Sequence, residues 1–102
     1  MIVNLSFDNW SVNMATKPLT SGQIRAARAL VRWRAEDLAR ESAVGVATIR
    51  RAELAESATS MTAPNNMAVR HALEAAGIEF IEENGGGAGV RLRKEQQQGK
   101  RK

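Results

Sequence analysis

The sequence predicts a mainly α-helical domain of four to five helices that ends in a β-hairpin. Between residues 20 and 77, apolar side chains recur at spacings of three and four, the period of a helix that buries one face. From residue 78 the period changes to two on both sides of a glycine-rich stretch, which indicates two short strands. The 102 residues suffice for one small domain.

The two ends of the chain are predicted to lie outside this domain. Residues 1–19 form an N-terminal arm that is either flexible or a short strand, because three apolar residues alternate with polar ones there: Val3, Leu5 and Phe7. Met14 is either an internal methionine or a second translation start. Residues 95–102, "EQQQGKRK", are too polar to bury a core and form a disordered basic tail.

The first two helices follow from their start signals. Thr20 or Ser21 can cap a helix over residues 22–33, which has an apolar stripe at Ile24, Ala27 and Val31. A second helix is predicted over residues 35–42. Acidic residues occupy its first turn, where the helix dipole favours negative charge: Glu36 and Asp37.

Two further helices precede the strands. The third is predicted over residues 46–54 or 46–55, with Ile49 and Ala52 facing inward and the arginines at positions 50 and 51 more exposed. The fourth runs over residues 64–76, because Pro64 suits a first helical turn and Gly77 suits the position just past a helix end.

The segment "IEFIEENGGGAGVRLRK", residues 78–94, is predicted to form the β-hairpin. Ile78 and Phe80 share one face of the first strand, and Val90 and Leu92 share one face of the second. Two roles remain open for these side chains. They pack against the first and fourth helices, or they form a homodimer interface, which we favour because an exposed edge strand is a ready pairing surface.

The stretch "AEDLARESAVGVATIRRAE", residues 35–53, has the spacing of a helix-turn-helix motif, with two helices joined by a turn of three to four residues. Ala39 is small where the two helices cross, Val44 is an apolar turn residue, and Ile49 anchors the second helix on the first. The second helix of such a motif fits the major groove of B-DNA and presents its N-terminal residues to base edges.

The charge distribution favours the same class of partner. The formal net charge is +4, and residues 17–55 carry eight Lys or Arg against four Asp or Glu. Residues 56–90 carry one Arg against five Glu, and residues 91–102 carry six Lys or Arg against one Glu. The basic excess lies in the helix-turn-helix region and the tail, where it would attract an anionic polymer.

Several other classes of function are not predicted. The absence of cysteine excludes disulfides and thiolate metal sites, and the single histidine, His71, makes a His-rich metal site or a Ser-His dyad improbable. No nucleophile has a base nearby, so we expect neither enzymatic activity nor a cofactor. No secretory signal and no run of roughly 18 apolar residues is present, so the expected location is cytoplasmic, away from membranes.

The motifs also resemble a known family. The segment "SGQIRAARALVRWRAEDLARESAVGVATIRRAE" and the later segment "VRHALEAAGIEFIEENGGGAGVRLRK" resemble the lambda-repressor-like Xre/Cro family of bacterial and phage transcriptional regulators. The resemblance covers about residues 20–94, and "EDLA", "ATIRR" and Glu53 fall at the family's spacing. It implies a lambda-repressor-like helix-turn-helix domain over residues 20–77, followed by a dimerisation hairpin over residues 78–94.

The resemblance also implies roles for individual residues. Arg28 and Glu53 match a pair that forms a structural ion pair across the core. Four residues match base-reading positions: Val46, Ala47, Thr48 and Arg51. Six residues match positions near DNA phosphates, the two asparagines through their backbone amides: Gln23, Arg34, Gly45, Arg50, Asn65 and Asn66.

The sequence departs from the family at the DNA-facing positions. Relatives usually have Ser-Gln where this chain has Arg34 and Ala35, a glycine in place of Ala43, a capping serine in place of Gly45, and a polar residue in place of Val46. Two functions therefore stay open. The leading one is a dimeric, sequence-specific double-stranded DNA-binding repressor at a palindromic operator, with its own operon as a candidate target. The alternative is a protein-binding module, antitoxin-like or an anti-activator, with weakened DNA binding.

Overall fold

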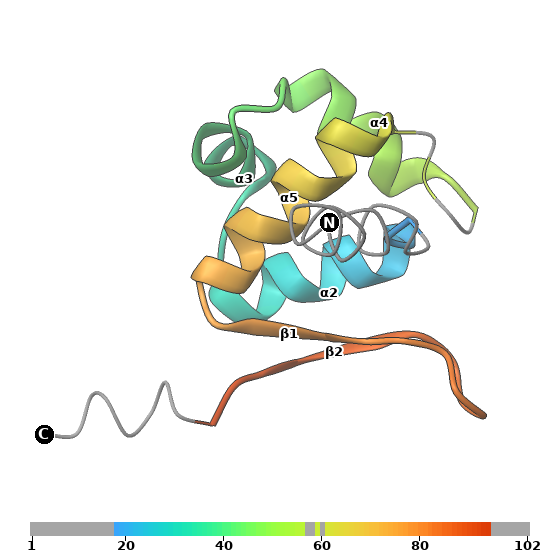
Figure 1. The fold of residues 1–102 in the computed structure, drawn as a ribbon. Coiled ribbons are helices and arrows are strands. Elements are labelled where there is room, and N and C mark those ends of the chain that lie inside the picture. Colours follow the sequence, from blue (N-terminus) through green and yellow to red (C-terminus); the bar gives the residue numbers. More distant parts are fainter. Residues whose placement is uncertain (1–17, 57–58, 60, 95–102) are drawn as a thin grey trace, which may run out of the picture.

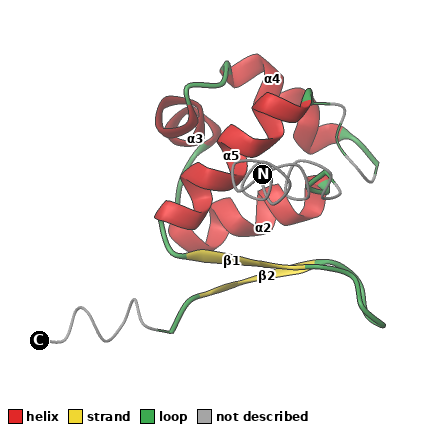
Figure 2. Ribbon diagram, in the orientation of Figure 1, coloured by secondary structure: helices red, strands yellow, loops and turns green. Residues whose placement is uncertain are grey.

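A computed structural model describes residues 18–56, 59 and 61–94. Within these residues four helices precede a two-stranded antiparallel hairpin, as the sequence predicts (Figures 1 and 2). The elements are α2 (Ser21–Val31), α3 (Ala35–Ser42), α4 (Val46–Leu54), α5 (Ala63–Ala75), β1 (Ile78–Ile81) and β2 (Gly89–Leu92). The predictions for residues 1–17, including Met14, and for the tail at 95–102 lie outside the described residues. The prediction that the arm extends to residue 19 is wrong at its end, because Leu19 is fully buried in the core.

Local hydrogen bonds set both ends of α2. The backbone amide of Gln23 donates to Thr20 Oγ1 at 3.0 Å, and the backbone amide of Thr20 donates to Gln23 Oε1 at 3.0 Å. This reciprocal capping box identifies Thr20, rather than Ser21, as the cap. The helix ends at Val31, two residues before the predicted end, because Arg32 adopts a left-handed conformation with a φ of 61°.

Three residues join α3 to α4, and their conformation produces the helix-turn-helix. Ala43 has a φ of 61°, so the chain leaves α3 through a left-handed residue. The Ser42 hydroxyl donates to Leu38 O at 2.6 Å and accepts from the amide of Val44 at 3.2 Å. Val44 is buried in the core, and Gly45 then precedes the first turn of α4. The predicted bounds of both helices are confirmed.

The core lies between the four helices and extends to the start of the hairpin. Ile49 of α4 is 1% exposed, and α4 contacts both α3 and α2. The buried apolar residues form one cluster: Leu19, Ile24, Ala27, Ala35, Leu38, Val44, Ile49, Ala52, Val69, Leu73 and Ile78. The cluster includes residues of all four helices, and α4 packs within it against α2 and α3.

The hairpin packs on the helices of its own chain. Ile78 lies opposite Leu92 and Phe80 lies opposite Val90, so these four side chains share one face. β2 contacts α2, β1 contacts α2 and α5, and the hairpin lies below α2 while α4 lies above it in Figure 1. The prediction that this face forms a dimer interface is wrong for Ile78, which is fully buried. Phe80 and Val90 are half-buried against the same core, whereas Leu92 is 40% exposed.

The helix before the hairpin begins one residue earlier than predicted. Thr62 caps α5 because its Oγ1 accepts the amide of Asn65 at 3.2 Å, and Pro64 lies in the first turn. The chain leaves α5 through Gly77, whose φ of 109° favours glycine, as the sequence indicates. No helix in the described part of the chain is long and apolar enough to cross a membrane.

The left-handed alanine in the turn gives a stability prediction. Replacement of Ala43 by glycine should raise the free energy of unfolding by about 1 kcal/mol, because a Cβ destabilises the left-handed conformation and glycine has none. The expected rise in Tm is roughly 4–8 °C. The control is Ala26→Gly in the exposed interior of α2, which should lose about 1 kcal/mol. Equal and destabilising shifts for both variants would contradict the prediction.

Candidate nucleic-acid interface

The outward surface of α4 is a single stripe of four residues, which we call the α4 stripe: Ala47, Arg50, Arg51 and Leu54. All four are exposed, and their spacing of three and four residues places them on one side of the helix. The opposite side carries Ile49, Ala52 and Glu53, which are buried. The sequence prediction that the two arginines face outward is therefore confirmed.

The first turn of α4 presents few polar atoms. Val46 is half-buried and packs against the core, whereas Ala47 and the preceding Gly45 are exposed. Arg51 Nη2 donates to Thr48 Oγ1 at 3.4 Å, so the guanidinium is turned toward the N-terminal end of the helix. The predicted base-reading positions thus lie on adjacent turns, with Arg51 as their one charged member.

The second arginine of the α4 stripe is ion-paired across the helix-turn-helix. Arg50 Nη2 contacts Glu36 Oε2, which lies in the first turn of α3, and both side chains are about half exposed. Arg34 lies just before α3 and is exposed. The backbone amide of Arg34 donates to Asp37 Oδ2 at 2.8 Å, and this bond together with Arg40 holds the pKa of Asp37 below its ordinary value.

A partly buried ion pair joins α4 to α2. Arg28 Nε lies 2.7 Å from Glu53 Oε2, and Arg28 Nη2 donates to Glu53 Oε1 at 2.8 Å. The remaining Nη1 donates to Trp33 O at 2.8 Å. The bond to Glu53 raises the pKa of Arg28, in spite of the burial that opposes it. The ion pair that the resemblance implies is thus confirmed in its geometry, and its bidentate form restricts rotation of α4 about its axis.

Two further contacts from α2 reach the C-terminal end of α4. Arg25 Nη1 donates to Glu53 O at 2.6 Å, and Ser21 Oγ donates to Ala55 O at 2.8 Å. Both bonds satisfy carbonyls at or just beyond the end of the helix, where no intrahelical partner is present. Neither contact was predicted, because the pairs are separated by 28 and 34 residues and leave no periodic signal.

The prediction that Gln23 contacts a phosphate is wrong. Its side chain is 7% exposed, and both ends of its amide are already bonded. Oε1 accepts the amide of Thr20, and Nε2 donates to Gly89 O at 3.1 Å in the hairpin. Gln23 therefore links the start of α2 to β2 and presents no donor to a ligand.

The predicted phosphate contacts at the start of α5 are also not supported. Asn66 is 7% exposed, and its Oδ1 accepts the amide of Leu19 at 3.0 Å. The backbone amide of Asn66 donates to Thr62 O at 2.8 Å, and that of Asn65 donates to the Thr62 hydroxyl. The prediction that these two backbone amides donate to a phosphate is wrong, because Thr62 already accepts a hydrogen bond from each of them.

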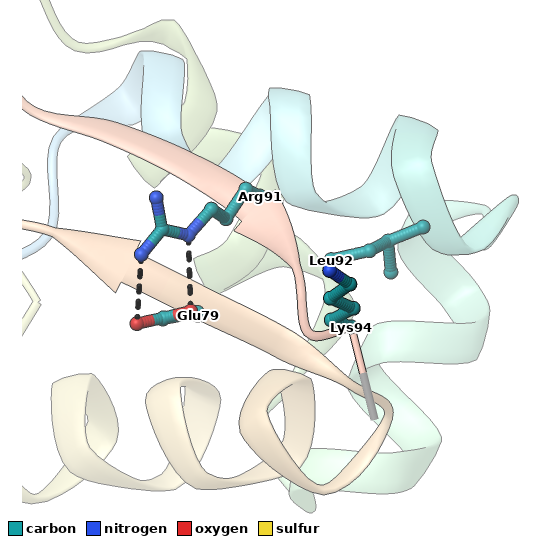
Figure 3. Close-up of a pocket in the computed structure, with 4 residues that line it drawn as sticks. All are labelled: Glu79, Arg91, Leu92 and Lys94. Carbon is teal, nitrogen blue, oxygen red and sulfur yellow. Dashed lines mark hydrogen bonds and ion pairs between the residues drawn. The ribbon is translucent and has the colours of Figure 1, made fainter. Parts of the chain in front are cut away.

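A shallow depression lies on the outer face of the hairpin, remote from the α4 stripe. It has a volume of about 460 Å³ and is lined by Glu79, Arg91, Leu92 and Lys94 (Figure 3). Arg91 Nε and Nη2 donate to Glu79 Oε1 and Oε2 at 3.0 and 3.2 Å, and this pairing lowers the pKa of Glu79. These two charges satisfy each other, which leaves Lys94 as the remaining charged residue in the lining of the depression.

No protein-family model matches the sequence, and a search of curated proteins finds no match. The resemblance to the Xre/Cro regulators therefore rests on the residues quoted above. The candidate interface consists of the α4 stripe, the first turn of α4 and Arg34.

Proposed function

We propose that this protein is a sequence-specific, double-stranded DNA-binding transcriptional regulator that acts as a dimeric repressor at a palindromic operator. The observation that carries the proposal is the α4 stripe, in which two exposed arginines project from the second helix of a helix-turn-helix. The Arg28–Glu53 pair and the buried Ile49 hold that helix from its inner side. A rigidly held helix with an exposed basic face has the form that enters a major groove.

Different residues are assigned different contacts in the proposed complex. Arg51 is turned toward the leading end of α4 and is the candidate for a bidentate contact with guanine O6 and N7. Ala47 is small and exposed, which suits contact with a thymine methyl. Arg34, just before α3, and Arg50, within α4, are assigned to phosphates, and phosphate contacts position the protein without reading sequence.

The proposed dimer places two α4 helices in successive turns of the major groove. Each strand of the two-stranded sheet pairs with one other strand among the described residues, so we assign dimerisation to the hairpin through strand pairing at an outer edge. Leu92 adds exposed apolar surface on β2. Repression follows from occupation of promoter DNA, and no cofactor is needed for that mechanism.

One observation favours the alternative of a protein-binding module. Leu54 is 83% exposed at the C-terminal end of the α4 stripe, and Ala47 at the other end is also apolar. A partner helix that packed along the stripe would bury both residues. The two arginines between them favour DNA, because a protein partner would have to neutralise both charges.

A salt-dependent gel-shift titration tests the proposal. The probe is the DNA upstream of the protein's own gene, and a scrambled duplex is the competitor. We expect a discrete complex that survives excess competitor, with log K falling against log salt at a slope of about −4 for a dimer with two phosphate-contacting arginines in each protomer. A smear that competitor removes, or an affinity independent of salt, would contradict specific DNA binding and would favour the protein-binding alternative.

A further inference from the structure

Glu36 lies between the cations that the proposed function assigns to phosphates. It belongs to the first turn of α3, and its carboxylate forms an ion pair with Arg50 of α4. Both side chains are about half exposed, so the pair lies at the surface rather than in the core, and its arginine belongs to the α4 stripe. It is an ion pair between the two helices of the helix-turn-helix.

The electrostatic surroundings of Glu36 indicate that Arg34 is also close. The pKa of Glu36 lies below its ordinary value, first because its own backbone amide donates to the carboxylate and then because Arg50 does so. The positive charge of Arg34 lowers it further. A single carboxylate therefore stays ionised at neutral pH beside both arginines that are assigned to phosphates.

We infer that Glu36 is a specificity-determining residue of the proposed DNA interface: its carboxylate occupies Arg50 in the free protein and must release it to a DNA phosphate in the specific complex. The inference rests on the proposed function. A carboxylate and a phosphate present similar oxygen pairs to a guanidinium, so each excludes the other from the same Arg50 donors. An exposed ion pair is weak, so the exchange requires only a small driving force.

The exchange affects specific and non-specific complexes differently. In a specific complex, base contacts fix the register of α4, and Arg50 is then aligned with a phosphate that replaces Glu36. In a non-specific complex, which is held by charge alone, Arg50 is not aligned and Glu36 continues to neutralise it. Glu36 thus lowers affinity for unrelated DNA more than affinity for the operator, which raises the specificity ratio.

The test compares Glu36→Gln with Glu41→Gln by gel-shift titration on operator and scrambled duplexes. Glu41 lies on the same helix and is about half exposed, and its carboxylate lies 3.8 Å from Arg40 Nε. Glu41→Gln therefore removes the same negative charge as Glu36→Gln, but from a carboxylate that is paired with Arg40 instead of Arg50. For Glu36→Gln we expect roughly fivefold tighter binding to scrambled DNA and a salt slope steeper by about 0.9 per protomer. The gain on the operator should be smaller.

A second pair of variants assigns the effect to Arg50. The Glu36→Gln change should have little further effect on scrambled-DNA affinity when Arg50 is already replaced by alanine. Equal effects of Glu36→Gln and Glu41→Gln, or a Glu36→Gln effect that persists without Arg50, would overturn the inference. If the wild-type protein binds the operator but Glu36→Gln leaves the affinities for operator and scrambled DNA unchanged, the inference about Glu36 is wrong and the proposed function stands. If the wild type binds no DNA at low salt, the proposed function fails with it.

Discussion

Replacement of Glu53 by alanine is expected to destabilise the domain by about 3 kcal/mol, at the lower end of the 3–5 kcal/mol typical when a buried ion pair loses one partner. The Glu53 side chain is 10% exposed and that of Arg28 is 23% exposed. The variant leaves the Arg28 guanidinium largely desolvated, with Trp33 O as its remaining acceptor. For a domain of this size the expected fall in Tm is roughly 12–24 °C.

The measurement is thermal and urea unfolding followed by circular dichroism. Glu56→Ala is the matched control, because Glu56 is exposed just beyond α4, and its removal should change the free energy of unfolding by no more than about 0.5 kcal/mol. A Glu53→Ala variant within 1 kcal/mol of the wild type would show that water reaches the Arg28 guanidinium and would remove the pair as the main constraint on α4.

A double variant separates the two ways in which the pair can act. Replacement of both partners, Arg28→Met with Glu53→Leu, should recover most of the stability that Glu53→Ala loses, because no buried charge is left uncompensated. If the apolar double variant is stable but binds operator DNA more weakly, the pair contributes chiefly to the orientation of α4. If it remains as unstable as Glu53→Ala, then packing rather than charge explains the loss.

The elements that the sequence predicts best are those whose causes are local. The bounds of α3 and α4 follow from helix start signals, from a three-residue turn and from apolar spacing within about 20 residues. The outward direction of Arg50 and Arg51 follows from the same spacing. The Arg28–Glu53 pair is different, because only the family resemblance indicated it; nothing in the local pattern links positions 25 residues apart.

The wrong predictions concern polar groups whose partners lie far along the chain. Gln23 donates to Gly89, 66 residues away, and Asn66 accepts from Leu19, 47 residues away. A polar residue near a helix start looks available to a ligand until the fold shows which backbone groups it satisfies. The dimer-interface prediction for the hairpin is wrong at Ile78 for a related reason. The alternation of the sequence shows that Ile78 and Phe80 share a face, but only the fold shows that α2 and α5 cover that face.

Replacement of Arg51 is expected to have the largest effect on recognition. Arg51→Ala should lower the ratio of operator to scrambled-DNA affinity by roughly 5- to 150-fold, which corresponds to the 1–3 kcal/mol of a bidentate arginine–guanine contact. Arg40→Ala is the control. The Arg40 side chain is exposed on α3 and lies outside the candidate interface, so this variant removes the same charge and should leave the ratio unchanged. Quantitative competition gel shifts at one salt concentration provide both affinities.

Arg51→Lys distinguishes base recognition from charge. Lysine keeps the positive charge but lacks the planar pair of donors that matches guanine O6 and N7. If Arg51 reads a base, Arg51→Lys should retain affinity for scrambled DNA and still lose most of the specificity ratio. If Arg51→Lys keeps the full ratio, then the residue acts through its charge, and discrimination must come from Ala47, Thr48 or the shape of the DNA. We would then assign base reading to the first turn of α4. The half-buried Val46 in that turn has little side chain exposed for contact with a base.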